Sequence, residues 1–194
     1  MTVKYKKKKQ VFELEANIHK FSLAGWIEKG SKELDEVREY LKTKNQTLFK
    51  SLADRGVILD YECDHNLVVT TGLNVLARLL AGDSTYSGEV NYGAVGIGAT
   101  PVPALGDTTL VSEQFRSLQQ SQSASAGVAY IDFFYSAGDF DTDSIGAITE
   151  FGNFIDGTSS VDTGQMFSFI ATGGWNKNAT TSLFVSCEYT LANA

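Results

Sequence analysis

The sequence has few of the residues that build metal centres or disulfide frameworks. Among its 194 residues are two cysteines and two histidines. Cys63 and Cys187 lie far apart without a CxxC spacing, and His19 and His65 lack the paired spacing of a metal site. The sequence therefore predicts neither a zinc site nor a disulfide framework, and both cysteines are expected to be reduced and buried.

Long apolar runs are also missing. No window approaches the roughly 18 consecutive apolar residues that a membrane span requires. The lysine-rich start is followed by Glu13 and Glu15, which interrupt the apolar stretch that a signal peptide needs. The sequence thus predicts synthesis in the cytoplasm.

Basic residues are scarce in the second part of the chain. Residues 67–194 hold three basic and twelve acidic side chains, a net charge of −9, whereas residues 1–10 hold five lysines and no acid. Phosphate backbones bind Lys and Arg because counterions are released, so the acidic part is predicted to be a poor nucleic-acid binder. Only the lysine tail is suited to nucleic acid. Its favoured role is to solubilise the chain or to pair with an acidic surface on a neighbouring subunit.

Apolar and aromatic residues are plentiful, at 43% and 11% of the chain, which predicts a folded core. Near residue 66 the composition changes from densely charged to rich in Gly, Ser, Thr and Ala. We therefore expect an N-terminal arm and helical assembly region in residues 1–65 and a β-rich region in residues 66–194. The expected fold class is α+β, mainly β, in which the arm and helix precede a small antiparallel β-sandwich-like domain with one short helix.

The first region begins with apolar residues whose spacing matches an extended or irregular arm, bounded by Gly25 and Gly30. Such an arm has little core of its own, so we expect it to lie along a neighbouring subunit. Deleting residues 1–29 is then expected to leave the β domain folded. The side chains predicted to anchor the arm in an assembly are Phe12, Leu14, Ile18, Phe21 and Trp26.

Two helices are predicted. The first runs from the capping residue Ser31 to Gly56, with acidic residues near its start and lysines toward its other end. Its apolar stripe is expected to dock on the chain's own domain and consists of Leu34, Val37, Leu41, Leu48 and Leu52. The second helix is predicted over about residues 71–81, with Gly82 placed to end it.

Short runs of β-forming residues separated by Gly, Ser, Asp and Asn predict strands. In the last run, alternate apolar residues are expected to place one face in a core and the other in solvent. The predicted strands span residues 57–61, 67–69, 92–97, 128–135, 166–171 and 183–191.

Several short motifs follow one another after residue 66. They are NLVVTTGLNVLARLLAGD (66–83), NYGAVGIGATP (91–101), DTTLVSE (107–113), ITEFGNFIDG (148–157) and QMFSF (165–169). Their order resembles that in a widespread group of phage tail-fibre-like and virion structural proteins. Asn153 departs from the pattern, because this position is usually apolar in the group, and residues 1–65 match no part of it.

The resemblance implies a structural protein of a tailed bacteriophage particle, as a tail, fibre, neck or capsid-surface component that acts through subunit–subunit contacts. It implies a place in the virion after synthesis in the host cytoplasm, with other virion proteins as partners, self-association into a homo-oligomer and no membrane contact. The protein is expected not to be an enzyme. The alternative is a receptor- or glycan-binding module at a fibre tip, with Trp175, Tyr86 and Tyr135 as stacking faces.

One acidic loop has the charge pattern of a calcium site. Asp139, Asp141, Asp143 and Glu150 match positions 1, 3, 5 and 12 of an EF-hand loop. Position 6 is Ser144 rather than glycine, and the flanks resemble strands, so a calcium ion would bind here in a loop of another kind. The alternative is a solvated acidic turn without a metal.

The glycines at positions 93, 96 and 98 have the spacing of a phosphate-binding loop. No Lys-Ser or Lys-Thr pair follows them, so they are predicted to permit a tight turn and close packing instead. Glu150 is suited to accept backbone N–H bonds and fix the neighbouring corner of the fold. The predicted roles of these glycines and of Glu150 are therefore to specify the fold.

Overall fold

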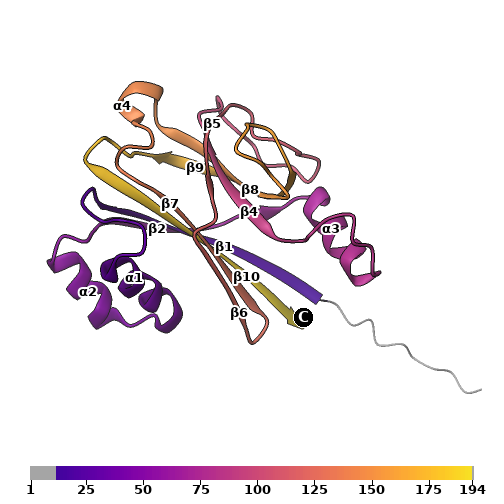
Figure 1. Ribbon diagram of the computed structural model, residues 1–194, viewed down its shortest axis with the longest axis horizontal. Coiled ribbons are helices and arrows are strands. Elements are labelled where there is room, and N and C mark those ends of the chain that lie inside the picture. Colours follow the sequence, from indigo (N-terminus) through magenta and orange to yellow (C-terminus); the bar gives the residue numbers. More distant parts are fainter. Residues whose placement is uncertain (1–11, 194) are drawn as a thin grey trace, which may run out of the picture.

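The computed structural model describes residues 12–193, which form two five-stranded antiparallel sheets packed face to face (Figure 1). Sheet A has the strand order β2-β1-β10-β7-β6, and sheet B has the order β3-β9-β8-β4-β5. Strands make up 43% of the structure and helices 20%. The predicted fold class, α+β and mainly β, is confirmed.

Sheet A joins strands that are far apart in the sequence. Its central strand β10 (Thr181–Asn193) pairs with β1 (Phe12–Ala24) on one side and with β7 (Val128–Tyr135) on the other. β2 (Ile58–His65) and β6 (Ser121–Ser125) form the two edges. The ends of β1 and β10 that lie beside each other are visible next to the C-terminus in Figure 1.

The prediction of an arm is wrong, because residues 12–24 form a strand with partners on both sides. The apolar pattern looked irregular because both faces of β1 are buried. Ile18 faces sheet B, whereas Phe21 faces the helices, and Lys20 between them is 2% exposed. Lys20 Nζ is paired with Asp60 Oδ2 at 2.6 Å. Deleting residues 1–29 would therefore remove a strand from the middle of sheet A.

Sheet B contains β3 (Leu67–Val68), β9 (Gln165–Trp175), β8 (Ile148–Ile155), β4 (Val90–Gly96) and β5 (Glu113–Leu118). Its inner face packs on sheet A through an aliphatic and aromatic core. This core also holds the buried polar side chains Asn153 and Ser168, which are hydrogen-bonded to Tyr189 of sheet A. Gly93 permits this contact, since a Cβ there would lie 2.7 Å from the ring of Phe133 in sheet A. The predicted packing role of this glycine follows from that distance.

A helical hairpin covers the outer face of sheet A (Figure 1). It consists of α1 (Lys32–Thr43) and α2 (Gln46–Asp54), where the sequence predicted one continuous helix. Ser31 caps α1 as predicted, but Lys44 adopts a left-handed backbone conformation with φ of 51° and Asn45 caps α2. The apolar stripe docks on the chain's own sheet, which confirms that prediction.

Two further helices lie beside sheet B and in the connection between the sheets. α3 (Thr70–Leu80) confirms the second predicted helix, and α4 (Thr142–Ile145) is a single turn. α3 approaches β9 closely, because a Cβ on Gly72 would lie 2.6 Å from the carbonyl oxygen of Phe167. Among the described residues, no helix is long and apolar enough to cross a membrane.

Several local predictions need correction. The second face of β10 is covered by the hairpin rather than by solvent, since Phe184 is fully buried there. Cys187 is free and buried as expected, whereas Cys63 is free but exposed. The predicted boundary at residue 66 does not divide the sheets, because sheet A takes β1 and β2 from one side of it and β10, β7 and β6 from the other.

Candidate functional site

Three segments of the chain meet at one buried carboxylate. Glu150, in β8, has no solvent exposure. Its Oε1 accepts hydrogen bonds from Gly98 N at 3.0 Å and Ser112 N at 2.7 Å, and its Oε2 accepts one from Val111 N at 2.9 Å. The prediction that Glu150 fixes a corner through backbone N–H groups is confirmed. We call Glu150 and its three donors the Glu150 corner.

The glycines of the second motif are needed at the Glu150 corner. A Cβ on Gly96 would lie 2.4 Å from Glu150 Oε1, and a Cβ on Gly98 would lie 2.8 Å from the same atom. Real Cβ atoms do not approach an oxygen so closely, so the carboxylate reaches its donors only because side chains are missing there. These glycines act in packing, as predicted.

The four carboxylates of the predicted calcium loop are used in different ways. Asp139 Oδ2 accepts from Ser136 N at 2.6 Å, and Asp141 Oδ1 caps α4 by accepting from Asp143 N at 2.9 Å. Glu150 is committed to its own corner. Within residues 12–193 no three His, Cys, Asp or Glu side chains form a group that could hold a metal ion. The calcium hypothesis stays a prediction. Three of its four carboxylates, those of Asp139, Asp141 and Glu150, accept backbone N–H bonds.

The predicted assembly anchors lie in three different environments. Ile18 and Phe21 are 1% and 0% exposed in this chain's own core, so they are not available to a neighbouring subunit. Leu14 is half-buried at the end of the sandwich, and Trp26 is 60% exposed in the turn after β1. The side chain of Phe12 lies outside the described part of the structure. Of this set, Leu14 and Trp26 remain available for contacts.

The aromatic residues considered for glycan stacking are mostly in the core. Trp175 is 2% exposed and Tyr135 is fully buried, so neither presents a face to solvent. Tyr86 is half-buried, and the guanidinium of Arg78 lies over its ring at 5.8 Å. The predicted stacking platform of three rings is therefore not present.

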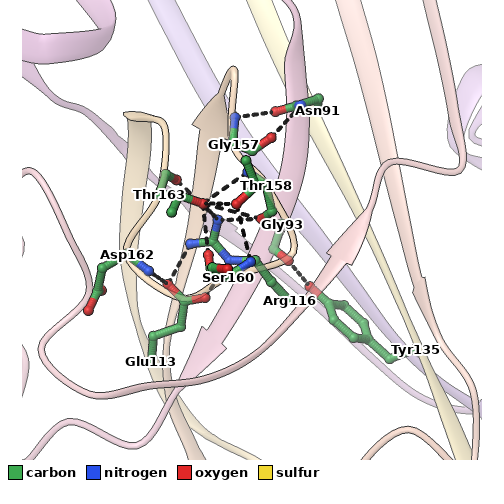
Figure 2. Close-up of polar contacts among 10 residues, drawn as sticks. All are labelled: Asn91, Gly93, Glu113, Arg116, Tyr135, Gly157, Thr158, Ser160, Asp162 and Thr163. Atoms are coloured by element: carbon green, nitrogen blue, oxygen red, sulfur yellow. Dashed lines mark hydrogen bonds and ion pairs between the residues drawn. The ribbon is translucent and has the colours of Figure 1, made fainter.

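A second buried charge, Arg116, holds the loop between β8 and β9 (Figure 2). Its Nε and Nη2 donate to the two carboxylate oxygens of Glu113 at 2.6 and 2.7 Å, and both side chains are nearly inaccessible to solvent. Its Nη1 donates to the carbonyl of Thr158 and to Thr163 Oγ1. The guanidinium also stacks over the ring of Phe154 at 4.8 Å. Such a bidentate buried pair fixes the geometry of the loop.

A row of polar side chains crosses the outer face of sheet A beneath α1. Cross-strand neighbours in this row, one from each strand, are Cys63, His19, Ser186, Asp132 and Ser121. Ser186 Oγ donates to Asp132 Oδ1 at 2.7 Å, and Arg38 of α1 donates to Asp132 Oδ2 at 2.9 Å. A cleft of about 240 Å³ opens onto these side chains.

The row contains Ser, His and Asp, but its hydrogen bonds differ from those of a hydrolytic triad. His19 Nδ1 contacts Tyr61 Oη at 3.0 Å, and His19 Nε2 contacts Glu188 Oε2 at 3.2 Å. Ser186 donates to Asp132 rather than to the imidazole, whereas a triad needs a serine–histidine bond. Burial lowers the pKa of His19, and the charge of Lys44 acts in the same direction. The arrangement binds α1 to sheet A.

Sequence reasoning missed this row because it depends on strand register. The five residues come from five strands, and their positions in the sequence span more than half of the chain. One local signal exists: in β10 the outward positions change from Phe184 to Ser186 and Glu188, which is unusual under a packed helix. Without the pairing of β1 with β10, that signal cannot be connected to His19.

No protein-family model matches the chain, and neither a curated protein nor a solved structure matches it at a significant level.

Proposed function

We propose that this protein is a structural component of a tailed bacteriophage particle and acts through contacts between subunits. The support comes first from the order of motifs in residues 66–194, which resembles that of phage tail-fibre-like and virion structural proteins. The chain's place within the particle is that of a tail, fibre, neck or capsid-surface component, and immunogold labelling distinguishes these positions.

The observation that carries the proposal is the Glu150 corner. Three of the motifs supply it: one contributes Gly98, one contributes Val111 and Ser112, and one contributes Glu150. Local turns of unrelated origin would not be expected to meet at one buried carboxylate. Their convergence means that the motifs describe a single unit of the fold, which strengthens the resemblance as a guide to function.

The surface of the molecule is also suited to contacts. Several large apolar side chains are more than half exposed, including Trp26, Leu80, Val102 and Leu191. Single exposed apolar residues are common on protein surfaces, whereas contiguous apolar patches and grooves mark interaction sites. Leu191 lines such an apolar groove at one end of the sandwich.

The proposal is tested by looking for the chain in purified particles. Phage produced by a strain that carries the gene are separated from free protein on a density gradient, and the chain is sought by peptide mass spectrometry and immunogold labelling. We expect it to migrate with intact particles in a constant ratio to the major capsid protein. Detection among free proteins alone would contradict the proposal.

A pair of variants makes this test specific to the fold. Glu150→Ala removes the acceptor of the Glu150 corner and should prevent incorporation, because the corner no longer forms. Glu39→Ala removes an exposed carboxylate of α1 and should be incorporated normally. Equal incorporation of both variants would show that the motif unit is not needed for the particle.

A further inference from the structure

An apolar groove opens at the end of the sandwich where β1 begins and β10 ends. It has a volume of about 260 Å³. Leu14, Ile131 and Leu191 of sheet A form one wall, and Leu76 of α3 and Phe167 of β9 form the other. None of the described residues that line it is charged. We call this space the end groove.

The end groove is large enough for an aromatic side chain. A dry, apolar cavity of about 150 Å³ accepts a benzene ring, so a space of about 260 Å³ has room for the two fused rings of an indole. Leu191, at the rim, is 62% exposed, so the apolar lining continues to the surface. The groove therefore fits an apolar anchor that enters from solvent.

The chain carries such an anchor at its other end. Trp26 is 60% exposed in the turn that follows β1. Leu14 and Ala24 lie near the two ends of β1, and a strand rises about 3.3 Å per residue, so the groove and the turn are roughly 30 Å apart. Trp26 cannot reach the groove of its own chain, and only a second copy can bring the two together.

Charge favours this pairing of surfaces. The chain has a net charge of −7, so two copies repel each other over most orientations. The turn around Trp26 is neutral, since Glu28 and Lys29 beside it are of opposite sign. The acidic residue at the groove is Glu89, which is exposed between two lining residues, Gly88 and Val90. Lys29, three residues after Trp26, is a cation beside the anchor, and Glu89 is an anion beside the groove, so the two surfaces carry charges of opposite sign.

We infer that copies of this chain associate head to tail, with Trp26 of one copy inserted into the end groove of the next. The inference deepens the proposed function, on which it rests for its biological meaning, by naming the contact between subunits. Because the two surfaces differ, the interface is heterologous, and it generates a ring if the rotation closes and a filament if it does not.

The test uses two variants that each remove one half of the contact. Trp26→Ala removes the anchor, and Ala124→Glu places a charge at the exposed edge of the groove. Both positions are exposed, so both variants should keep the wild-type melting temperature.

In sedimentation equilibrium each variant alone should be monomeric under conditions in which the wild type associates. The dissociation constant should rise at least about thirtyfold, as for an anchor residue. Leu59→Ala, which removes a similarly exposed apolar side chain, is the matched control and should associate like the wild type.

Mixing the variants distinguishes this interface from any other. Trp26→Ala keeps an intact groove and Ala124→Glu keeps an intact tryptophan, so an equimolar mixture should form a one-to-one dimer and nothing larger. Fluorescence gives a second readout, because Trp175 is buried in every state and only Trp26 should shift to shorter wavelength on association.

Each other outcome overturns the inference. A symmetric contact of Trp26 with Trp26 would let Ala124→Glu associate on its own, and a groove occupied by another molecule would leave the wild type monomeric at every concentration. Association that survives both variants would place the contact elsewhere. None of these results bears on whether the chain is found in purified particles, so the failure of this inference and the failure of the proposed function are separate.

Discussion

At the centre of sheet A, the first strand of the described chain, β1, pairs with the last, β10. The central strands of sheet B are closer in sequence, since they all lie within residues 90–175. The two sheets also use polar residues differently. Sheet A buries Lys20 and Asp132 within its strands, whereas sheet B buries Glu150 and Arg116 where loops meet strands. Sheet A therefore depends on long-range strand pairing, and sheet B depends on single charged residues that organise local loops.

The largest expected effect comes from removing β1. Deletion of residues 1–29 should abolish cooperative unfolding, because β2 and β10 lose their common neighbour and the core between the sheets is opened. Circular dichroism and thermal melting measure this. The point variant Ile18→Asp should act in the same direction, while Leu59→Asp at an exposed position should not. A deletion variant that still melts cooperatively would mean that sheet A does not depend on its central pairing.

The Glu150 corner gives the next largest effect. Glu150→Ala leaves one buried and two partly buried backbone N–H groups without their acceptor, and the free energy of unfolding should fall by about 4 kcal/mol. Urea denaturation measures the change. Glu150→Gln keeps one acceptor oxygen and should lose roughly half as much. Equal losses in the two variants would show that the isosteric amide restores nothing, so that the charge of the carboxylate rather than its shape matters at this corner.

The Arg116 pair should follow closely. Arg116→Met leaves Glu113 as a buried charge without its partner and releases the loop, which should cost about 3 kcal/mol in urea denaturation. Arg78→Met breaks a solvent-exposed pair with Asp83 and should cause a much smaller loss, because exposed ion pairs contribute little to stability. If both losses were small, buried charge would not be what stabilises sheet B.

The variant Asp141→Ala tests how much the segment between β7 and β8, which contains α4, contributes to stability. The side chain caps α4, so its loss should lower the free energy of unfolding by about 1 kcal/mol. We expect the same loss in calcium and in chelator, since the observed role of the carboxylate needs no metal. A loss that occurs only in the presence of calcium would instead support the calcium hypothesis.

The smallest effect is the pH response of the polar row. The pKa of His19 is lowered below its ordinary value of 6.5 by burial and by Lys44, while Glu188 opposes the shift and Tyr61 occupies the other ring nitrogen. As the pH falls below about 6.5, the unfolded chain binds a proton before the folded chain does, so stability decreases until folded His19 is also protonated. The difference between wild type and His19→Gln in thermal melts from pH 7.5 to 5 should show this slope. A flat difference would mean that His19 titrates alike in both states.

Local signals predicted α3, three strands of sheet B (β3, β4 and β9) and β7 of sheet A, but not β5 or β8. Gly82 follows α3 as expected, β7 has the predicted bounds of residues 128–135, and the roles of Glu150 and Gly93 follow from short-range chemistry. Such features depend on a few neighbouring residues, so their cause is visible in the sequence. The break at Lys44 was missed because a lysine rarely adopts a left-handed conformation, although Asn45 is a strong capping residue.

Long-range features could not be predicted from the sequence. β1 lacks alternation because sheet B buries Ile18 on one face and the helical hairpin buries Phe21 on the other. A segment buried on both faces looks like neither an amphipathic strand nor a helix. The polar row and the end groove both depend on the pairing of β1 with β10, so neither could be found before that pairing was known.

The pairing of β1 with β10 also sets the order of events during synthesis. β1 leaves the ribosome early, but its longest partner is complete only when residue 193 has been added. Contacts of such sequence separation form slowly, since a long loop must close first. A chain interrupted before β10 would keep an unpaired edge on β1 and an incomplete end groove. Only chains that have finished this last strand would then be competent to join other copies, so the fold itself would screen out truncated products.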